Sequence, residues 1–145
     1  MNTEEPCLTL PARSSDRPGS FAKITWPVTE TRLATVTDTR SWSDEILAGW
    51  RNPLREDTAL IVTELVTNAI LHGGGLHSLQ LTLLHDDGVL VEVGDGSQDP
   101  PEPREPDPQR ASGFGLRLVA ALTQDMGQWR HASGKTVWAR LGPER

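Results

Sequence analysis

Apolar and polar residues alternate in several short segments of this chain, a pattern typical of β-strands, whose successive side chains point to opposite faces. Asp87-Gly88 is a turn signal between two of these segments, and Ser-Gly-Lys at 133–135 separates the last two. The alternation therefore predicts one strand, then a hairpin, then a closing pair of strands. They lie near residues 21–26, 78–83, 89–93, 128–132 and 136–141.

Three other segments space their apolar residues as α-helices do. The first helix is expected at 29–50 with Thr29 as its cap, the second at about 55–71, and the third at about 116–123. A run of three glycines at 73–75 ends the second helix. The first helix is expected to bury a stripe made of Leu33, Val36, Ser43, Leu47 and Trp50.

The order of elements is strand, two helices, hairpin, helix and a final pair of strands. Adjacent strands mostly form hairpins, so we expect a mixed, mostly antiparallel sheet with helices on one face. The predicted fold class is therefore an α/β (α+β) two-layer sandwich. It occupies residues 20–142, after a disordered N-terminal tail at 1–19. Residues 99–108 hold five prolines and are expected to form an exposed loop, a candidate lid.

Composition narrows the possible function classes. A length of 145 residues suits one domain, and a formal net charge of −6 argues against a general nucleic-acid binder or a protein of anionic membrane surfaces. The single cysteine, Cys7, excludes an internal disulfide and favours a cytoplasmic location. The sequence contains neither a signal peptide nor an apolar run as long as the roughly 20 residues of a membrane helix.

Three polar residues with useful chemistry recur at a spacing of four in the second predicted helix. Glu64, Asn68 and His72 therefore share one face of that helix. The amide oxygen of Asn68 suits Mg²⁺, and the carboxylate of Glu64 suits a general base. Each residue also has an ordinary explanation: a solvated amide, an exposed helix glutamate, and a histidine favoured at a helix C-terminus.

Two glycine-containing segments add further candidate chemistry. Asp95 ends a predicted strand, where a carboxylate can accept a hydrogen bond from the amine of adenine, and Gly96 would let a flat ring approach the backbone. Gly113 and Gly115 precede the third helix, where backbone N–H groups can face phosphates. Taken singly, an Asp-Gly turn and a Gly-x-Gly sequence are both common in loops.

The order and spacing of these motifs together resemble the GHKL ATPase superfamily, which has the Bergerat ATP-binding fold. Within it, the chain is most similar to the small, single-domain anti-sigma-factor serine/threonine protein kinases of bacteria, which have a histidine kinase-like ATP-binding domain. The motifs are Glu-Leu-Val-Thr-Asn-Ala at 64–69 with His72, Val-Glu-Val-Gly-Asp-Gly-Ser at 91–97, Gly-Phe-Gly-Leu at 113–116 and Gly-Lys-Thr-Val-Trp-Ala at 134–139. The resemblance covers about residues 20–142.

The resemblance implies ATP and Mg²⁺ as cofactors and gives roles to individual positions. Asn68 matches the magnesium ligand, Glu64 the proposed general base and Asp95 the adenine-reading aspartate. Residues 97–112 match the ATP lid. The other implied nucleotide-binding residues are His72, Gly96, Gly113, Phe114, Gly115, Leu116 and Thr136.

The function implied by the resemblance is a regulatory kinase. It would phosphorylate a serine on an anti-sigma-factor antagonist, sequester a sigma factor, and act as a cytoplasmic homodimer. Ile24, Trp26 and Trp42 are candidates for the dimer surface, although core packing explains them equally well.

Two other functions stay open at this stage. The lid is acidic and proline-rich, with Arg104, Arg110 and Arg117 as its basic candidates for a γ-phosphate. This departure favours, as an alternative, a non-catalytic nucleotide-binding module that regulates partners by protein–protein binding only. The last alternative is a plain α/β interaction domain with no nucleotide site.

Overall fold

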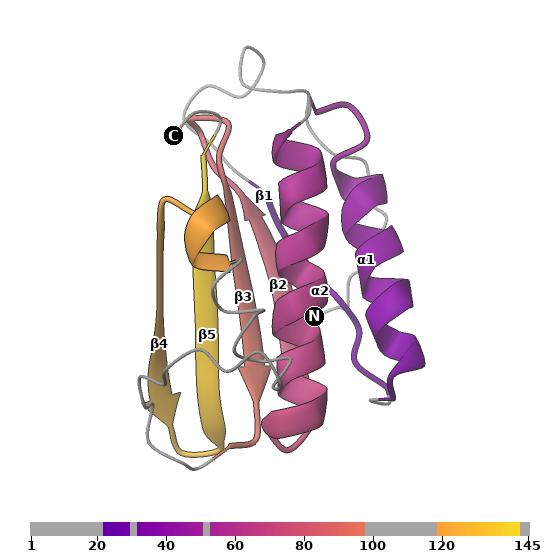
Figure 1. Cartoon of the computed structure of the whole chain (residues 1–145), viewed down its shortest axis with the longest axis vertical. Helices are drawn as coiled ribbons and strands as arrows, with labels where there is room; N and C mark the ends of the chain where they lie inside the picture. The colour runs from indigo at the N-terminus through magenta and orange to yellow at the C-terminus, as the bar shows by residue number, and fades with distance from the viewer. Residues whose placement is uncertain (1–21, 30–31, 51–52, 98–118, 143–145) are drawn as a thin grey trace.

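The computed structural model describes residues 22–29, 32–50, 53–97 and 119–142. Its sheet has the strand order β1-β2-β3-β5-β4, and every pair of neighbours is antiparallel (Figure 1). The elements are β1 (Ala22–Thr25), α1 (Ala34–Ile46), α2 (Leu54–His72), β2 (Leu76–Leu83), β3 (Val89–Asp95), β4 (Asp125–His131) and β5 (Gly134–Leu141).

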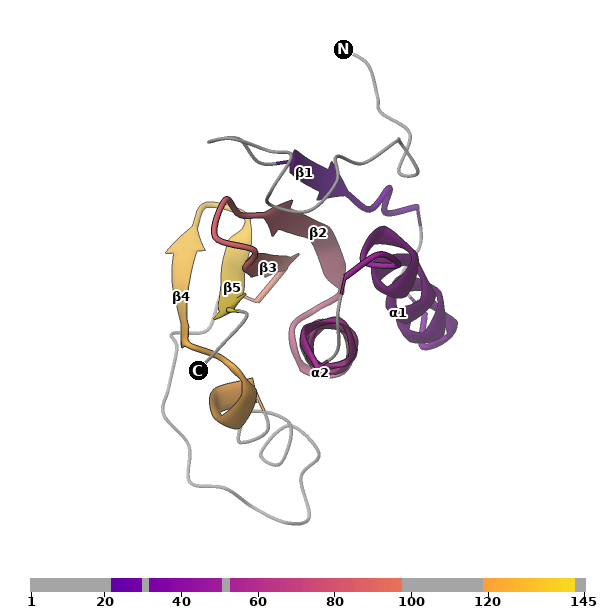
Figure 2. The same cartoon turned by 90° about the horizontal axis from the view of Figure 1, so that it is seen from above.

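The helices cover one face of the sheet, which confirms the predicted two-layer α/β sandwich. Figure 2 shows α1 and α2 on the same side, with a helical turn at 119–122 over β5 on that side as well. The sheet of the described residues is antiparallel throughout rather than mixed. The expected start of the third helix, at 116–118, and most of the expected lid and tail lie outside the described residues.

The strand register separates the two faces of the sheet. Leu81 pairs with Val91, and Val91 pairs with Ala139, so all three point toward the helices, and all three are completely buried. On the opposite face, Gln80 pairs with Glu92, and Glu92 pairs with Trp138; these three side chains are partly exposed. The apolar residues of the predicted alternation therefore face the core, and the residues between them lie on the outer face of the sheet.

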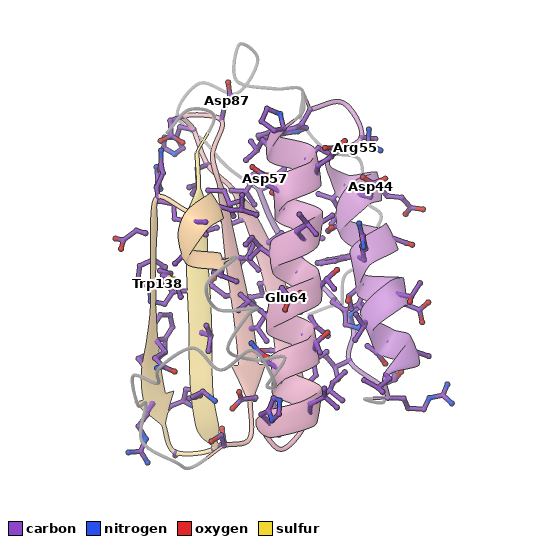
Figure 3. All side chains as sticks on the ribbon, in the orientation of Figure 1. Asp44, Arg55, Asp57, Glu64, Asp87 and Trp138 are labelled. Atoms are coloured by element: carbon purple, nitrogen blue, oxygen red, sulfur yellow. The ribbon has the colours of Figure 1, made fainter. Side chains whose placement is uncertain are left out.

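The helix α2 packs against both α1 and the sheet. It buries Ile61, Val62 and Val66 completely and Leu65 almost completely. Burying an aliphatic side chain of this size contributes on the order of 2 kcal/mol each. A bidentate ion pair joins the two helices: Arg55 Nε and an Nη atom donate to the two carboxylate oxygens of Asp44, over 2.8 and 2.9 Å (Figure 3).

The first helix differs from the sequence-based expectation. It begins at Ala34 rather than after Thr29, and Leu33 of the expected stripe is 57% exposed. The side that it buries carries hydroxyl groups as well as apolar residues. Its buried residues are Thr35, Thr39, Trp42, Ser43 and Ile46.

Local hydrogen bonds explain why hydroxyl groups can be buried on this helix. The Thr35 hydroxyl accepts from the Arg32 N–H, the Thr39 hydroxyl donates to the Val36 carbonyl, and the Ser43 hydroxyl donates to the Arg40 carbonyl. A hydroxyl paired in this way adds little polarity to the core. Ser43, Leu47 and Trp50 of the expected stripe are buried, and its exposed member is Leu33. The buried side also includes Thr35 and Thr39, which the expected stripe left out.

Two of the candidate dimer residues belong to the core of the described fold. Ile24 and Trp42 are 5% and 7% exposed. The rings of Trp26 and Trp42 meet edge to face, with centroids 5.5 Å apart. Ile24 and Trp42 therefore belong to the hydrophobic core within one chain.

None of the helices in the described ranges is both long enough and apolar enough to span a membrane.

Gly134 allows β5 to start against the end of β3. Its φ of +155° is unfavourable for residues with a side chain, and a Cβ atom there would lie 1.8 Å from the Asp95 carbonyl oxygen. The backbones of β3 and β5 could not keep their present pairing with that atom inserted. Gly49, by contrast, has nothing within 4 Å of the corresponding position.

We expect Gly134→Ala to lower the free energy of unfolding by about 2 kcal/mol or more, because it combines backbone strain with a steric overlap. Urea denaturation followed by circular dichroism measures this change. Gly49→Ala is the matched control and should stay within about 0.5 kcal/mol of the wild type. Equal stability of the two variants would contradict the close approach of β3 and β5.

Candidate functional site

The helix α2 carries the row predicted from the spacing of four. Glu64 lies midway along the helix (Figure 3). Asn68 lies one turn later, and His72 is the last residue of the helix. Glu64 and Asn68 are half-buried, whereas His72 is exposed. The described residues provide no hydrogen-bond partner for the side chain of Glu64 or Asn68.

Partial burial changes the acidity of Glu64. Desolvation raises the pKa of its carboxyl above the usual value, because the charged form is less well hydrated there than in water. A raised pKa makes this carboxylate a better proton acceptor once it is ionised, which is the property that a general base requires.

Asp95 is the last residue of β3 and is almost fully buried, at 3% exposure. Its carboxylate has a partner on each oxygen: Oδ1 accepts from the Ser97 N–H over 2.8 Å, and Oδ2 accepts from Lys135 Nζ over 2.8 Å. An ionised carboxylate has about four acceptor positions, so room for further donors remains. Asp95 is therefore a fixed acceptor at the end of the central strands.

The end of α2 is attached directly to the end of β3. The Gly96 N–H donates to the Gly73 carbonyl over 2.8 Å, and a Cβ atom at Gly73 would lie 2.4 Å from Asp95 Oδ2. The carboxylate can lie against the end of the helix only because residue 73 has no side chain. Asn68 precedes Gly73 by five residues, or about 7 Å of helix. The structure thus brings Asp95 to the C-terminal end of the row formed by Glu64, Asn68 and His72, the Asn68 row.

Gly96 also lies at this junction. A Cβ atom there would lie 2.9 Å from Nε2 of His77 and 3.4 Å from the Gly74 carbonyl oxygen. Gly74 and Gly75 have φ angles of +77° and +111°, so the chain reverses through glycines after α2. The run of three glycines was predicted only as a helix end, but it also lets α2, β2 and β3 meet closely.

Thr136 lies away from Asp95. Asp95 pairs with Lys135 and Gly94 pairs with Thr136, so the Thr136 side chain is on the opposite face of the sheet. There it lies 3.1 Å from Nε2 of His131. Lys135 takes the place next to Asp95, and the sequence analysis did not single it out. The predicted last strand began at residue 136, which left Lys135 in the turn, whereas β5 begins at Gly134 and includes it.

The other predicted nucleotide contacts, Gly113, Phe114, Gly115 and Leu116, lie outside the described residues, as do the three arginines of the lid. Within the described ranges, no group of three or more His, Cys, Asp or Glu side chains could hold a metal. Magnesium that is held mainly by phosphates and water needs only one or two protein oxygens. A single amide such as that of Asn68 is compatible with this kind of site.

Comparison with known proteins gives one family. The model of the histidine kinase-like ATPase domain matches residues 29–141. A search of curated proteins gave no match.

Two solved structures from Erythrobacter litoralis EL346 are similar to this chain. One is the histidine kinase domain of the blue-light activated histidine kinase, with 18% identity, 81% of this chain and 65% of that chain covered, and a TM-score of 0.47. The other is the blue-light activated histidine kinase, with 19% identity, 77% and 42% covered, and a TM-score of 0.51. This chain therefore spans less than two thirds of either structure, and the second likeness supports the fold alone.

The raised pKa of Glu64 predicts a pH-dependent stability. Below the unfolded-state pKa the carboxyl is neutral in both states and desolvation has no effect. As the pH rises through the folded-state pKa, the folded state must hold a poorly hydrated charge and loses stability relative to the unfolded chain. Glu64→Gln removes this charge, so its stability relative to the wild type should increase with pH.

Urea denaturation of both proteins at about pH 4 and about pH 8 measures the difference. Glu45→Gln, on the exposed side of α1, is the control, and its difference from the wild type should stay constant. If the Glu64→Gln difference also stayed constant, the carboxyl would not be desolvated in the folded protein.

Proposed function

The chain belongs to the family of histidine kinase-like ATPase domains, and from this premise we propose that its site binds ATP together with Mg²⁺. The observation that supports this most directly is the close approach of Gly73 to Asp95. It places a buried acceptor at the C-terminal end of the helix that carries Asn68. At one end of the site, the Asp95 carboxylate suits the amino group of adenine. On the helix beside it, the Asn68 amide suits a cation bound to phosphates.

Each described residue has a distinct part in this proposal. Asp95 accepts a hydrogen bond from the 6-amino group of adenine, for which its two existing partners leave acceptor positions. Asn68 offers its amide oxygen to Mg²⁺, since that half-buried amide has no partner among the described residues. A Mg²⁺ ion held there would supply positive charge beside the phosphates.

Calorimetric titration with ATP, in the presence of Mg²⁺ and then of a chelator, tests this site. Wild-type protein should bind ATP more tightly with Mg²⁺, and Asn68→Ala should lose at least about tenfold in affinity with Mg²⁺ but little without it. Gln80→Ala removes a similar amide from the opposite face of the sheet and should bind as the wild type does. Absence of ATP binding by folded wild-type protein would refute the nucleotide site.

We further propose a cytoplasmic, homodimeric serine kinase that phosphorylates an anti-sigma-factor antagonist and sequesters a sigma factor. The motif resemblance supports this, and so does the position of Glu64 on the Asn68 row. In the reaction, the substrate serine oxygen attacks the γ-phosphorus, its proton passes to the Glu64 carboxylate, and the bond to ADP breaks. The raised pKa of Glu64 favours this proton transfer.

Transfer of labelled γ-phosphate to the cognate antagonist tests the kinase proposal. Glu64→Gln should reduce the transfer rate by about a hundredfold or more while ATP affinity changes little, because general-base catalysis contributes that much. Glu45→Gln is again the control and should retain the wild-type rate. Transfer at the wild-type rate by Glu64→Gln would remove Glu64 from the mechanism. No transfer by the wild type to a verified partner would remove the kinase activity.

The acidic, proline-rich segment 99–108 favours one alternative, a module that binds nucleotide without turnover. In that case the affinity for the partner protein would change with bound nucleotide, yet no phosphate would be transferred. Glu64→Ala would then leave partner regulation intact. Loss of regulation by that variant, with ATP binding retained, would contradict this alternative.

A further inference from the structure

Lys135 lies directly opposite Asp95 on the face of the sheet that the helices cover. The two residues are paired in the β3–β5 register, and their side chains share that face. The preceding residue, Gly134, places the start of β5 against the Asp95 backbone. The backbone of two central strands therefore determines where this ammonium group lies.

The Lys135 side chain is largely buried, and its ammonium group donates a hydrogen bond to Asp95. The Lys135 side chain is 18% exposed, and its Nζ atom lies 2.8 Å from Asp95 Oδ2. An ammonium group has three N–H donors, and Asp95 is the one side chain of the described residues that accepts from it. The other two N–H donors have no side-chain acceptor among the described residues, and they lie beside the carboxylate.

Asp95 and Lys135 together present an acceptor and a donor side by side. The Watson–Crick edge of adenine carries the complementary pair, with a donating 6-amino group next to the accepting N1 atom. A carboxylate alone can read only the amino group. The ammonium group adds a partner for the neighbouring ring nitrogen, and hydrogen bonds to a charged group are among the stronger ones.

We propose that Lys135 is a base-contacting residue, which donates a hydrogen bond to N1 of adenine while Asp95 accepts one from the 6-amino group. This inference rests on the proposed function, since it requires ATP at Asp95. Lys135 then has two roles: it neutralises the buried carboxylate in the free protein, and it contributes to the choice of base in the complex.

Calorimetric comparison of ATP with 1-deaza-ATP, which has a C–H in place of N1, tests this contact. Wild-type protein should bind 1-deaza-ATP about tenfold more weakly than ATP. Lys135→Met should bind the two nucleotides equally, because it has no donor for N1, and Lys135→Arg should restore part of the preference. The ratio of the two affinities cancels any general weakening caused by leaving Asp95 without its cation.

Two controls separate this contact from other effects. The nucleotide 7-deaza-ATP alters the purine ring away from N1 and should bind wild-type protein as ATP does. Lys23→Met removes an exposed lysine of β1 and should keep the wild-type preference.

The possible outcomes distinguish this inference from the proposed function. Equal binding of ATP and 1-deaza-ATP by the wild type would overturn the role of Lys135 while leaving the ATP site in place, and Lys135 would then only neutralise Asp95. A preference for ATP that persists in Lys135→Met would also overturn it. No binding of ATP at all by folded wild-type protein would instead refute the proposed function. If Lys135→Met fails to fold, equal binding of the two nucleotides by the wild type still overturns the role of Lys135, and Lys135→Gln replaces the methionine variant.

Discussion

The burial of the Asp95 carboxylate at the junction of a helix end and a strand end is the constraint on which this site depends. A carboxylate with so little exposure must be paired, and its partners here are the Ser97 N–H and the Lys135 ammonium group. Both partners belong to the sheet layer: Ser97 follows β3, and Lys135 lies in β5. The helix contributes the absence of a side chain at Gly73, which leaves room for the carboxylate.

The same junction explains why glycines cluster at this end of the molecule. Gly73 faces the carboxylate of Asp95, and Gly134 faces its backbone carbonyl. Side chains at these two positions would overlap with atoms of Asp95, so the backbone can come this close only without them. The close approach in turn holds α2, β3 and β5 in one fixed arrangement, so the carboxylate of Asp95 has a fixed position.

The arrangement also separates two kinds of chemistry along α2. The end proposed to contact the adenine base lies at the helix C-terminus, next to Asp95, while Glu64 lies about two turns earlier, where partial burial raises its pKa. A nucleotide bound with its base at Asp95 would extend its phosphates along the row of Asn68 and Glu64. Glu64 and His72 lie about 12 Å apart along the helix axis. This length suits a ligand with a base at one end and reacting phosphates at the other.

The sequence by itself determined the elements and much of the candidate site. Strand alternation gave the sheet faces because every second residue of a strand faces the core, and the spacing of four placed Glu64, Asn68 and His72 on one helix face. Only the tertiary structure decided that the buried face of α1 includes threonines, since their hydroxyls pair with the helix backbone. Only the tertiary structure showed that Lys135, rather than Thr136, lies beside Asp95. The reason is that strand register, which sequence alone leaves open, decides which residues of neighbouring strands share a face.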